Sequence, residues 1–436
     1  MVNVNNQLLK NECVFTPPSS VHASSFSSIR KQFPAIKENT GTIFFDNAAT
    51  TQKPQQVIDA MNSFYMQYCV NANRAAYSLS SKLHQQVEIT RATIARLING
   101  EATDIAFTSG ATDSLNLVAL AWGLHNLNDR DEVMLCLEDH QSAILPWINL
   151  KLHLNLFGKH IEIVHFPIHY SGIYDRKSIC EKITPRTRLV AMTHIHNLYG
   201  LEWDGKDLAE IRAQLPDDTL ISLDVSQSIG HTVVDTDQLA VDFISFSGHK
   251  MFAANGIGVL WVNPKIREKL YPARIGSKSS VTIVDGEMKI DRSTLAGILE
   301  CGTLNLPAIY SLKSAVEFIE SIGMKNIETH VSYLTRFLYE KLRVIPTIEF
   351  APGVNNYNCA KGFGIISFRF SGISSSDMAQ YLDQRGVQVR SGDHCLATKH
   401  SEEADYIRVS LHIYNTEEEI DLFVKFLEQV LSWQDL

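Results

Sequence analysis

The stretch DFISFSGHK, residues 242–250, closely follows the stretch LISLDVSQ, residues 220–227. The apolar run of the first stretch leads to Lys250, and that of the second leads to Asp224. A charge at the end of a buried strand is costly unless it is paired or takes part in covalent chemistry. The two stretches therefore predict neighbouring strands of one sheet, with a functional site where the strands end.

Short apolar runs alternate with helical segments from about residue 105 to residue 262. Such runs are typical of parallel strands that helices bury on both faces. They lie at residues 105–108, 133–137, 189–195, 220–225, 243–246 and 258–262. The pattern predicts an α/β fold with a mostly parallel sheet sandwiched between helices.

The pattern changes beyond residue 303. Helical periodicity at 308–322, 326–342, 375–385 and 416–431, with short strands at 348–350 and 364–370, predicts a smaller α+β domain. We expect four parts in the chain. They are a poorly ordered tail (1–27), rich in Asn, Ser and Pro, a segment joining the small domain (28–44), a large domain (45–303) and the small domain (304–436).

Composition excludes several classes of function. The chain has 436 residues and a net charge of −9, and no basic cluster offers the footprint that nucleic acid requires. No apolar run is long enough to span a membrane, and the first ten residues do not resemble a secretory signal. The seven cysteines are scattered without a CxxC pair, which argues against disulfides or a zinc site and for a reducing compartment, the cytoplasm.

The residues around Lys250 match the needs of a pyridoxal phosphate site. Lys250 is an amine for the cofactor aldehyde, and Asp224 can hold the pyridine nitrogen protonated. Gln227 can donate to the phenolic oxygen, and His140 can stack on the ring and exchange protons. Each has a plainer alternative, since Asp224 also suits a helix N-cap and a lone histidine after a strand is usually structural.

A phosphate group would find donors where a glycine turn opens a helix. The turn SGAT, residues 109–112, offers the backbone amide of Ala111 and the hydroxyl of Thr112. Ser247 and His249, which flank Gly248 before the lysine, could supply further donors. A glycine turn before a helix is weak evidence alone, and the prediction depends on its combination with Lys250.

Several motifs in sequence order carry a family resemblance from about residue 29 to residue 431. They are FDNAAT (45–50), FTSGAT (107–112), DH (139–140), HNLYG (196–200), DxxQ (224–227), SGHK (247–250), CGT (301–303), RSGDHC (390–395) and RVSL (408–411). The chain resembles the class V, fold-type I pyridoxal phosphate enzymes, and most of all the group II cysteine desulfurases and selenocysteine lyases. The resemblance implies a seven-stranded sheet in the large domain.

The resemblance also implies roles for individual residues. Lys250 would bind the cofactor covalently, and Asn197 would lie near its phenolic oxygen and the substrate. Thr303 would reach the phosphate of a partner subunit, which implies a homodimer. Arg408, with Arg390 nearby, would bind the α-carboxylate of the substrate through its guanidinium fork.

Cys395 falls where the family has its nucleophile, in a loop whose mobility would let the sulfur reach the substrate. Arg390 and His394 would stabilise its thiolate form. The chain departs from the group II pattern at Asn73, Tyr77, His196 and Asp393, and in the segment 274–278, which lacks the usual glycines. These departures concern the substrate side and leave the cofactor residues intact.

We therefore expect a cysteine desulfurase that converts L-cysteine to L-alanine and holds the sulfur as a persulfide on Cys395 for a sulfur-acceptor protein. The first alternative is another class V enzyme, an epimerase, aminotransferase or carbon–sulfur lyase, that does not use Cys395 as a nucleophile. The second is a catalytically inactive homologue that acts as a binding partner. No metal is expected.

Overall fold

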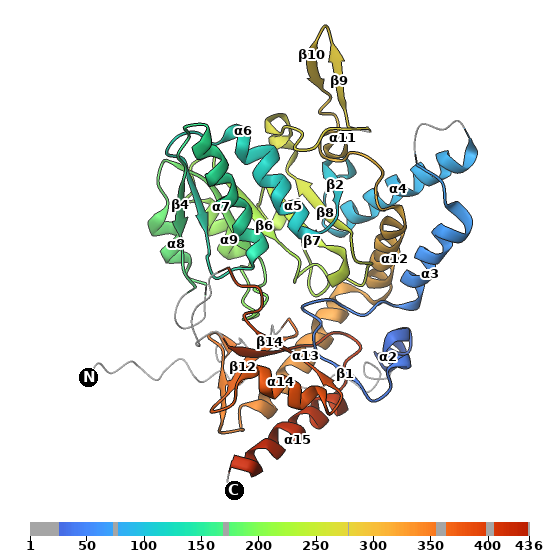
Figure 1. Ribbon diagram of the computed structural model, residues 1–436, viewed down its shortest axis with the longest axis vertical. Helices are drawn as coiled ribbons and strands as arrows, with labels where there is room; N and C mark the ends of the chain where they lie inside the picture. Colours follow the sequence, from blue (N-terminus) through green and yellow to red (C-terminus); the bar gives the residue numbers. More distant parts are fainter. Residues whose placement is uncertain are drawn as a thin grey trace.

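The structure is a computed structural model that describes residues 26–72, 77–168, 174–277, 279–354, 363–397 and 405–434. Figure 1 shows two layered bodies, with a large sheet and its helices above and a smaller sheet with its helices below. A β-hairpin projects from the upper end. Among the described residues, no helix is both long and apolar enough to cross a membrane.

The large sheet has seven strands in the order β2-β8-β7-β6-β5-β3-β4. They are β2 (Ile105–Thr108), β3 (Glu132–Leu135), β4 (Glu162–His165), β5 (Thr187–Thr193), β6 (Leu220–Asp224), β7 (Phe243–Ser247) and β8 (Gly258–Val262). The pairs β7-β6, β6-β5, β5-β3 and β3-β4 are parallel, whereas β8 is antiparallel to both of its neighbours. The predicted mostly parallel sheet is confirmed. Strand β4 was not predicted, because it lies at the sheet edge and has only two apolar residues.

Alternate residues of each strand enter two different cores, which is why helices cover both faces. In β8, Val259 and Trp261 lie in one core, and Leu260 and Val262 lie in the other. The first core includes residues of α4 (Ser78–Leu97), α8 (Arg176–Lys182), α9 (Gly205–Arg212) and α12 (Leu306–Ile322). The second includes residues of α5 (Ala111–Val118), α7 (Gln141–Leu156) and α11 (Leu295–Leu299). Strands buried on both faces are continuous apolar runs for this reason.

The smaller sheet is antiparallel, in the order β11-β12-β15-β14. Its strands are β11 (Ile348–Phe350), β12 (Ile365–Phe370), β14 (Arg390–Gly392) and β15 (Tyr406–Ser410), and its helices are α13 (Met324–Leu342), α14 (Ser375–Asp383) and α15 (Glu417–Gln434). The sequence did not predict β15, whose short run has a charged arginine at its centre. That arginine is Arg408, so the missed strand carries a predicted site residue.

The N-terminal segment joins the smaller sheet. Strand β1 (Ile43–Phe44) pairs in parallel with β13 (Val387–Gln388), and Asp46 forms a bridge with Ser410. The segment then enters α3 (Gln55–Ser63), which packs against α12. The division of the chain at residues 303/304 stays a prediction, and the packing of α12 against α3 and α4 favours assigning α12 to the larger body.

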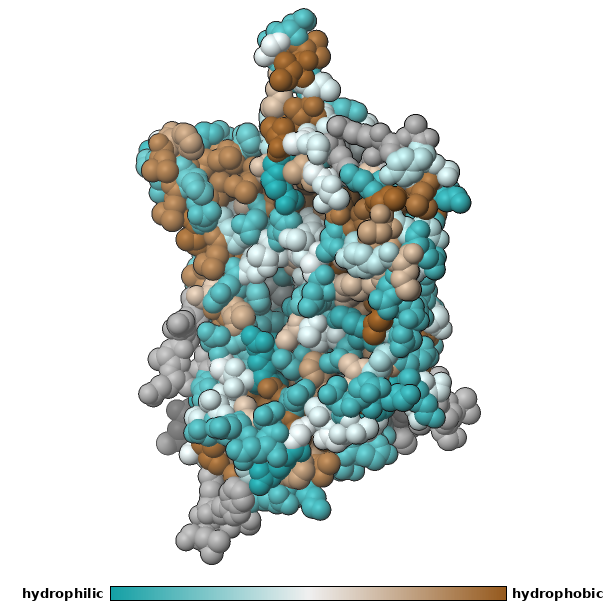
Figure 2. All heavy atoms as spheres, turned by 45° about the vertical axis from the view of Figure 1, so that its right-hand side comes forward, coloured by the Kyte–Doolittle hydropathy of each residue, from teal (hydrophilic) through white to brown (hydrophobic). Residues whose placement is uncertain are grey.

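The projecting hairpin consists of β9 (Val281–Val284) and β10 (Glu287–Ile290). Figure 2 shows hydrophobic side chains along it, and Ile283 is 80% exposed. An apolar strand pair that stands away from the body has no core of its own to bury it.

Candidate active site

The predicted site residues meet in one cavity of about 210 Å³ between the two bodies. It lies at the carboxyl ends of the parallel strands, where open α/β sheets bind ligands. The cavity is lined by Ala48, Ala49, Ala111, Thr112, His140, Ser142, Thr193, Asn197, Asp224, Ser226, Gln227, Ser247, His249, Lys250, Arg390, His394, Cys395 and Arg408. Every site residue predicted from the sequence is in this set except Thr303.

Lys250 and Asp224 lie on adjacent strand ends. Asp224 is the last residue of β6 and is in register with Ser245 of β7, and Lys250 ends the 3-10 turn that follows β7. Burial lowers the pKa of Lys250 to about 8, although Asp224 opposes this shift. An amine with a lowered pKa is a better nucleophile towards an aldehyde near neutral pH.

His140 begins α7 as its N-cap residue. Its Nδ1 accepts a hydrogen bond from the backbone amide of Ser142 (3.1 Å), so the proton of the neutral ring lies on Nε2. Burial, assisted by the nearby charge of Lys250, lowers the pKa of His140 to about 4. A neutral imidazole at this position can lie against an aromatic ring without bringing a second cation beside Lys250.

The turn before α5 is held against the strand that leads to Lys250. Ser247 Oγ accepts a hydrogen bond from the amide of Ala111 (2.8 Å), and Thr112 Oγ1 lies 2.8 Å from Ser142 Oγ. A Cβ at Gly258 would lie 2.5 Å from the backbone of Gly110, so only glycine lets β8 approach the turn this closely. The hydroxyls and the helix N-terminus thus face one end of the cavity.

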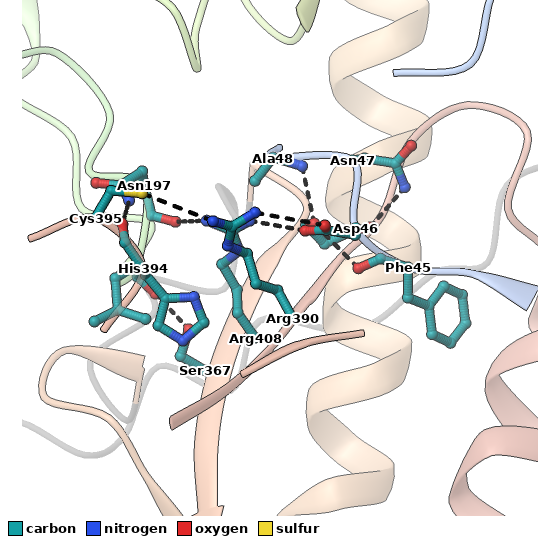
Figure 3. Close-up of polar contacts among 12 residues, drawn as sticks. Phe45, Asp46, Asn47, Ala48, Asn197, Ser367, Arg390, His394, Cys395 and Arg408 are labelled. Atoms are coloured by element: carbon teal, nitrogen blue, oxygen red, sulfur yellow. Dashed lines mark hydrogen bonds and ion pairs between the residues drawn. The ribbon is translucent and has the colours of Figure 1, made fainter. Parts of the chain in front are cut away.

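A chain of charged contacts crosses the opposite end of the cavity (Figure 3). Arg408 donates from Nη1 to the carbonyl of Asn197 (3.0 Å) and from Nη2 to Asp46 Oδ1 (2.8 Å). Arg390 Nη1 lies 4.0 Å from Asp46 Oδ2, and its Nη2 lies 3.7 Å from Cys395 Sγ. Asp46 was not predicted, although it is part of the FDNAAT motif that carried the resemblance.

The backbone around Cys395 is held by hydrogen bonds with Gln141, Asn197 and Asp393. The amide of Gln141 donates to the carbonyl of Cys395 (2.9 Å), and the Gln141 side chain donates to the carbonyl of Leu396 (3.1 Å). Asn197 Nδ2 donates to the carbonyl of His394 (2.9 Å), and Asp393 Oδ1 accepts from the Cys395 amide (3.1 Å). These contacts hold the Cys395 backbone in the position that the structure gives, and the expected loop mobility stays a prediction. Residues 398–404 lie outside the described part.

The predicted help of His394 to a Cys395 thiolate is wrong in its electrostatics. Burial, and then the charge of Arg408, lowers the pKa of His394 to about 3, so its ring is neutral near pH 7. Its Nε2 is paired with the carbonyl of Tyr406 at 2.9 Å. Arg390 remains as the cation in contact with the sulfur atom.

His196, one of the departures from the group II pattern, lies beside Asp139 of the DH motif. The Asp139 carboxylate accepts from the amide of Thr193 (3.1 Å) and lies 3.8 Å from His196 Nε2. Burial raises the pKa of Asp139 to about 8 and lowers that of His196 to about 4. Both side chains are therefore mainly uncharged near pH 7, so the contact is not a salt bridge.

Thr303 lines a neighbouring pocket, which also contains Cys301 and Arg274. The predicted contact of Thr303 with a partner subunit's phosphate stays a prediction. Tyr77 is half exposed, and Asn73 and Lys278 lie outside the described residues.

The buried histidines predict a stability that falls in acid. His196 and His231 have pKa values of about 4, lowered by burial, against an ordinary value near 6.5 in the unfolded chain. The unfolded state therefore binds more protons below pH 6.5, so the free energy of unfolding should fall by up to about 2 kcal/mol for each imidazole between pH 7 and pH 5. Asp139, whose pKa is raised, acts in the opposite direction. Urea unfolding of the full chain at pH 7, 6 and 5 measures the slope.

The non-titrating variant His231→Asn should show a smaller loss over the same pH range. A loss between pH 7 and pH 5 that is as large in a folded His231→Asn protein as in the original would contradict the assignment of His231 as buried and neutral.

Comparisons with known proteins identify the family of this chain. The family model for aminotransferase class-V matches residues 43–423. The chain is 32% identical to the probable cysteine desulfurase of Borreliella burgdorferi, over 93% of this chain and 96% of that protein, and 30% identical to the cysteine desulfurase of Salmonella choleraesuis, over 92% and 97%. The apo cysteine desulfurase from Thermococcus onnurineus NA1 superposes with a TM-score of 0.84 at 29% identity, covering 93% of this chain and 98% of the other. The chain therefore belongs to the aminotransferase class-V family.

Proposed function

We propose that this protein is a pyridoxal phosphate-dependent cysteine desulfurase, which removes sulfur from L-cysteine to give L-alanine and a persulfide on Cys395. The observation that carries the proposal is one cavity that holds Lys250, Asp224 and His140 at one end and Arg408 and Cys395 at the other. Relatives with the name cysteine desulfurase match more than nine tenths of the chain at 30–32% identity.

The cavity has the donors and acceptors that the cofactor needs. Three of its side chains, Thr193, Asn197 and Ser226, have a buried oxygen atom without a hydrogen-bond partner among the described residues. Buried polar atoms are rarely left unpaired, so their presence favours a polar ligand. The residues that would hold the cofactor are Ala111, Thr112, His140, Asn197, Asp224, Gln227, Ser247, His249 and Lys250.

When bound, pyridoxal phosphate supplies an electron sink for the electron pair that is left at the substrate Cα. Arg408, with Arg390 beside it, binds the α-carboxylate and so fixes which bond of the substrate faces Lys250. Lys250 Nζ, with its pKa near 8, removes the Cα proton and later returns a proton.

Cys395 Sγ takes up the sulfur. It attacks the substrate sulfur as a thiolate, a new S–S bond forms, and the substrate's carbon–sulfur bond breaks with its electron pair going to carbon. In sum, L-cysteine and the Cys395 thiol become L-alanine and a Cys395 persulfide, without an external oxidant or reductant. The contact with Arg390 supports the anionic form of the nucleophile.

The functional unit we propose is a homodimer in a reducing, cytoplasmic compartment. The position of Thr303 in a pocket outside the cavity favours a role towards a second subunit. All five cysteines among the described residues are free thiols. A persulfide on Cys395 needs a protein thiol to receive its sulfur, so a sulfur-acceptor protein is the expected partner.

An amino-acid panel tests the proposed reaction. The purified protein is offered L-cysteine, L-selenocysteine and other amino acids, and we expect alanine from L-cysteine together with an added sulfur on the peptide that contains Cys395. Consumption of another amino acid without release of alanine would favour an epimerase, aminotransferase or lyase. Absence of the visible absorption of lysine-bound cofactor would favour an inactive homologue.

A further inference from the structure

We propose that Asp46 is an internal carboxylate that competes with the substrate's α-carboxylate for Arg408, and so sets the affinity of the site for substrate. The inference rests on the proposed function only in assigning the substrate carboxylate to Arg408. Asp46 would thus be a specificity-determining residue, because only ligands whose carboxylate can displace it from Arg408 would bind.

Arg408 carries a buried charge. Its side chain is 3% exposed, and a buried guanidinium without a counter-charge is strongly unfavourable. Its Nη1 is bonded to the neutral carbonyl of Asn197, and its Nε has no partner among the described residues. Asp46 is therefore the only anionic side chain in contact with Arg408 in the part of the chain that the structure describes.

The position of the Asp46 carboxylate also bears on binding. Asp46 Oδ1 accepts a hydrogen bond from Nη2 of Arg408 at 2.8 Å, and Arg408 lines the charged end of the cavity. A substrate carboxylate that binds both Nη atoms of Arg408 must replace Asp46 as the acceptor of this hydrogen bond, or else lie beside the negative charge of Asp46. Either way, the Asp46 charge opposes the bound anion.

The Asp46 side chain has a second cation within reach, while its backbone is fixed. Arg390 Nη1 lies 4.0 Å away, so Asp46 can keep a counter-charge after it leaves Arg408. The neighbouring backbone is tied to β15, because the amide of Asn47 and the Asn47 side chain both donate to the carbonyl of Ser410. We therefore expect the exchange to need only a rotation of the Asp46 side chain, whose contacts with both arginines are drawn in Figure 3.

The test measures binding of propanoate, a carboxylate without an amine or thiol, to the full-length holoprotein by calorimetry. In Asp46→Asn the amide keeps the size and an acceptor for Nη2 but removes the charge. We expect the Kd for propanoate and the KM for L-cysteine to fall about tenfold. Asp46→Glu keeps the charge and should restore a Kd within about threefold of the original.

Two further variants locate the effect. Asp207→Asn removes an ion pair of similar geometry, 3.1 Å from Arg176 between helices α9 and α8, and should leave the Kd unchanged. Arg408→Gln should abolish propanoate binding. If Asp46→Asn does not fold, Asp46→Ser replaces it in the same comparison.

A Kd that is unchanged or higher in a folded Asp46→Asn protein overturns the inference, because Asp46 would then merely orient Arg408. Propanoate binding that survives Arg408→Gln overturns it as well. If the original protein releases no alanine from L-cysteine but Asp46→Asn still tightens propanoate binding, the proposed function fails and this inference stands.

Discussion

Replacing Lys250 by alanine should lower turnover of L-cysteine by about a thousandfold or more, since the residue is assigned both covalent attachment of the cofactor and proton transfer at Cα. The covalent part has a direct measurement. Borohydride treatment of the original holoprotein should leave a reduced pyridoxyl group on the peptide that contains Lys250, and the variant should carry none.

Lys53 offers a matched control for this experiment. It is also a largely buried lysine, its Nζ donates to the carbonyl of His249 at 2.9 Å, and burial lowers its pKa to about 7. It does not line the cavity. Lys53→Ala should therefore keep the adduct on Lys250. An adduct on Lys53, or none on Lys250 in the original protein, would contradict the proposed cofactor site.

The second large effect is expected at Cys395. In Cys395→Ala no thiolate can take the sulfur, so release of alanine from L-cysteine should fall by about a hundredfold or more. The cofactor residues are untouched, and the visible absorption of the holoprotein should stay as it was. Alanine release and spectra measured on the same preparation separate the two effects.

Cys301→Ala is the comparison for that loss. Cys301 is a partly exposed free thiol that lines the neighbouring pocket rather than the cavity, so its removal should leave alanine release within about twofold. If Cys395→Ala turns over L-cysteine at the original rate, sulfur transfer through Cys395 is excluded. The chain would then be a class V enzyme of another kind.

The cofactor end of the site could be predicted because its signals are local. Lys250 and Asp224 each follow an apolar run of strand length, and parallel strands bring their carboxyl ends to one edge. His140 and the turn before Thr112 likewise follow strands directly. The family resemblance then assigned roles to residues whose positions the strand pattern had already placed at that edge.

The charged end could not be predicted in the same way. Asp46 meets Arg408 across 362 positions of sequence, through the pairing of the N-terminal segment with a strand that was itself missed. The hydrogen bond from the Gln141 side chain to the carbonyl of Leu396 similarly spans 255 positions. No sequence periodicity or motif predicts that these residues touch, because each contact depends on how the two bodies pack against each other.

The N-terminal segment pairs with C-terminal strands of the smaller body, so its contacts must form late during synthesis. The seven strands of the upper sheet have left the ribosome once residue 262 has emerged, whereas β1 must wait for β13, and Asp46 for Arg408. A nascent chain can thus form the strand ends that carry Asp224 and Lys250 well before Cys395 and Arg408 have been added. In the proposed function, substrate recognition is therefore among the last properties that the chain acquires as it is made.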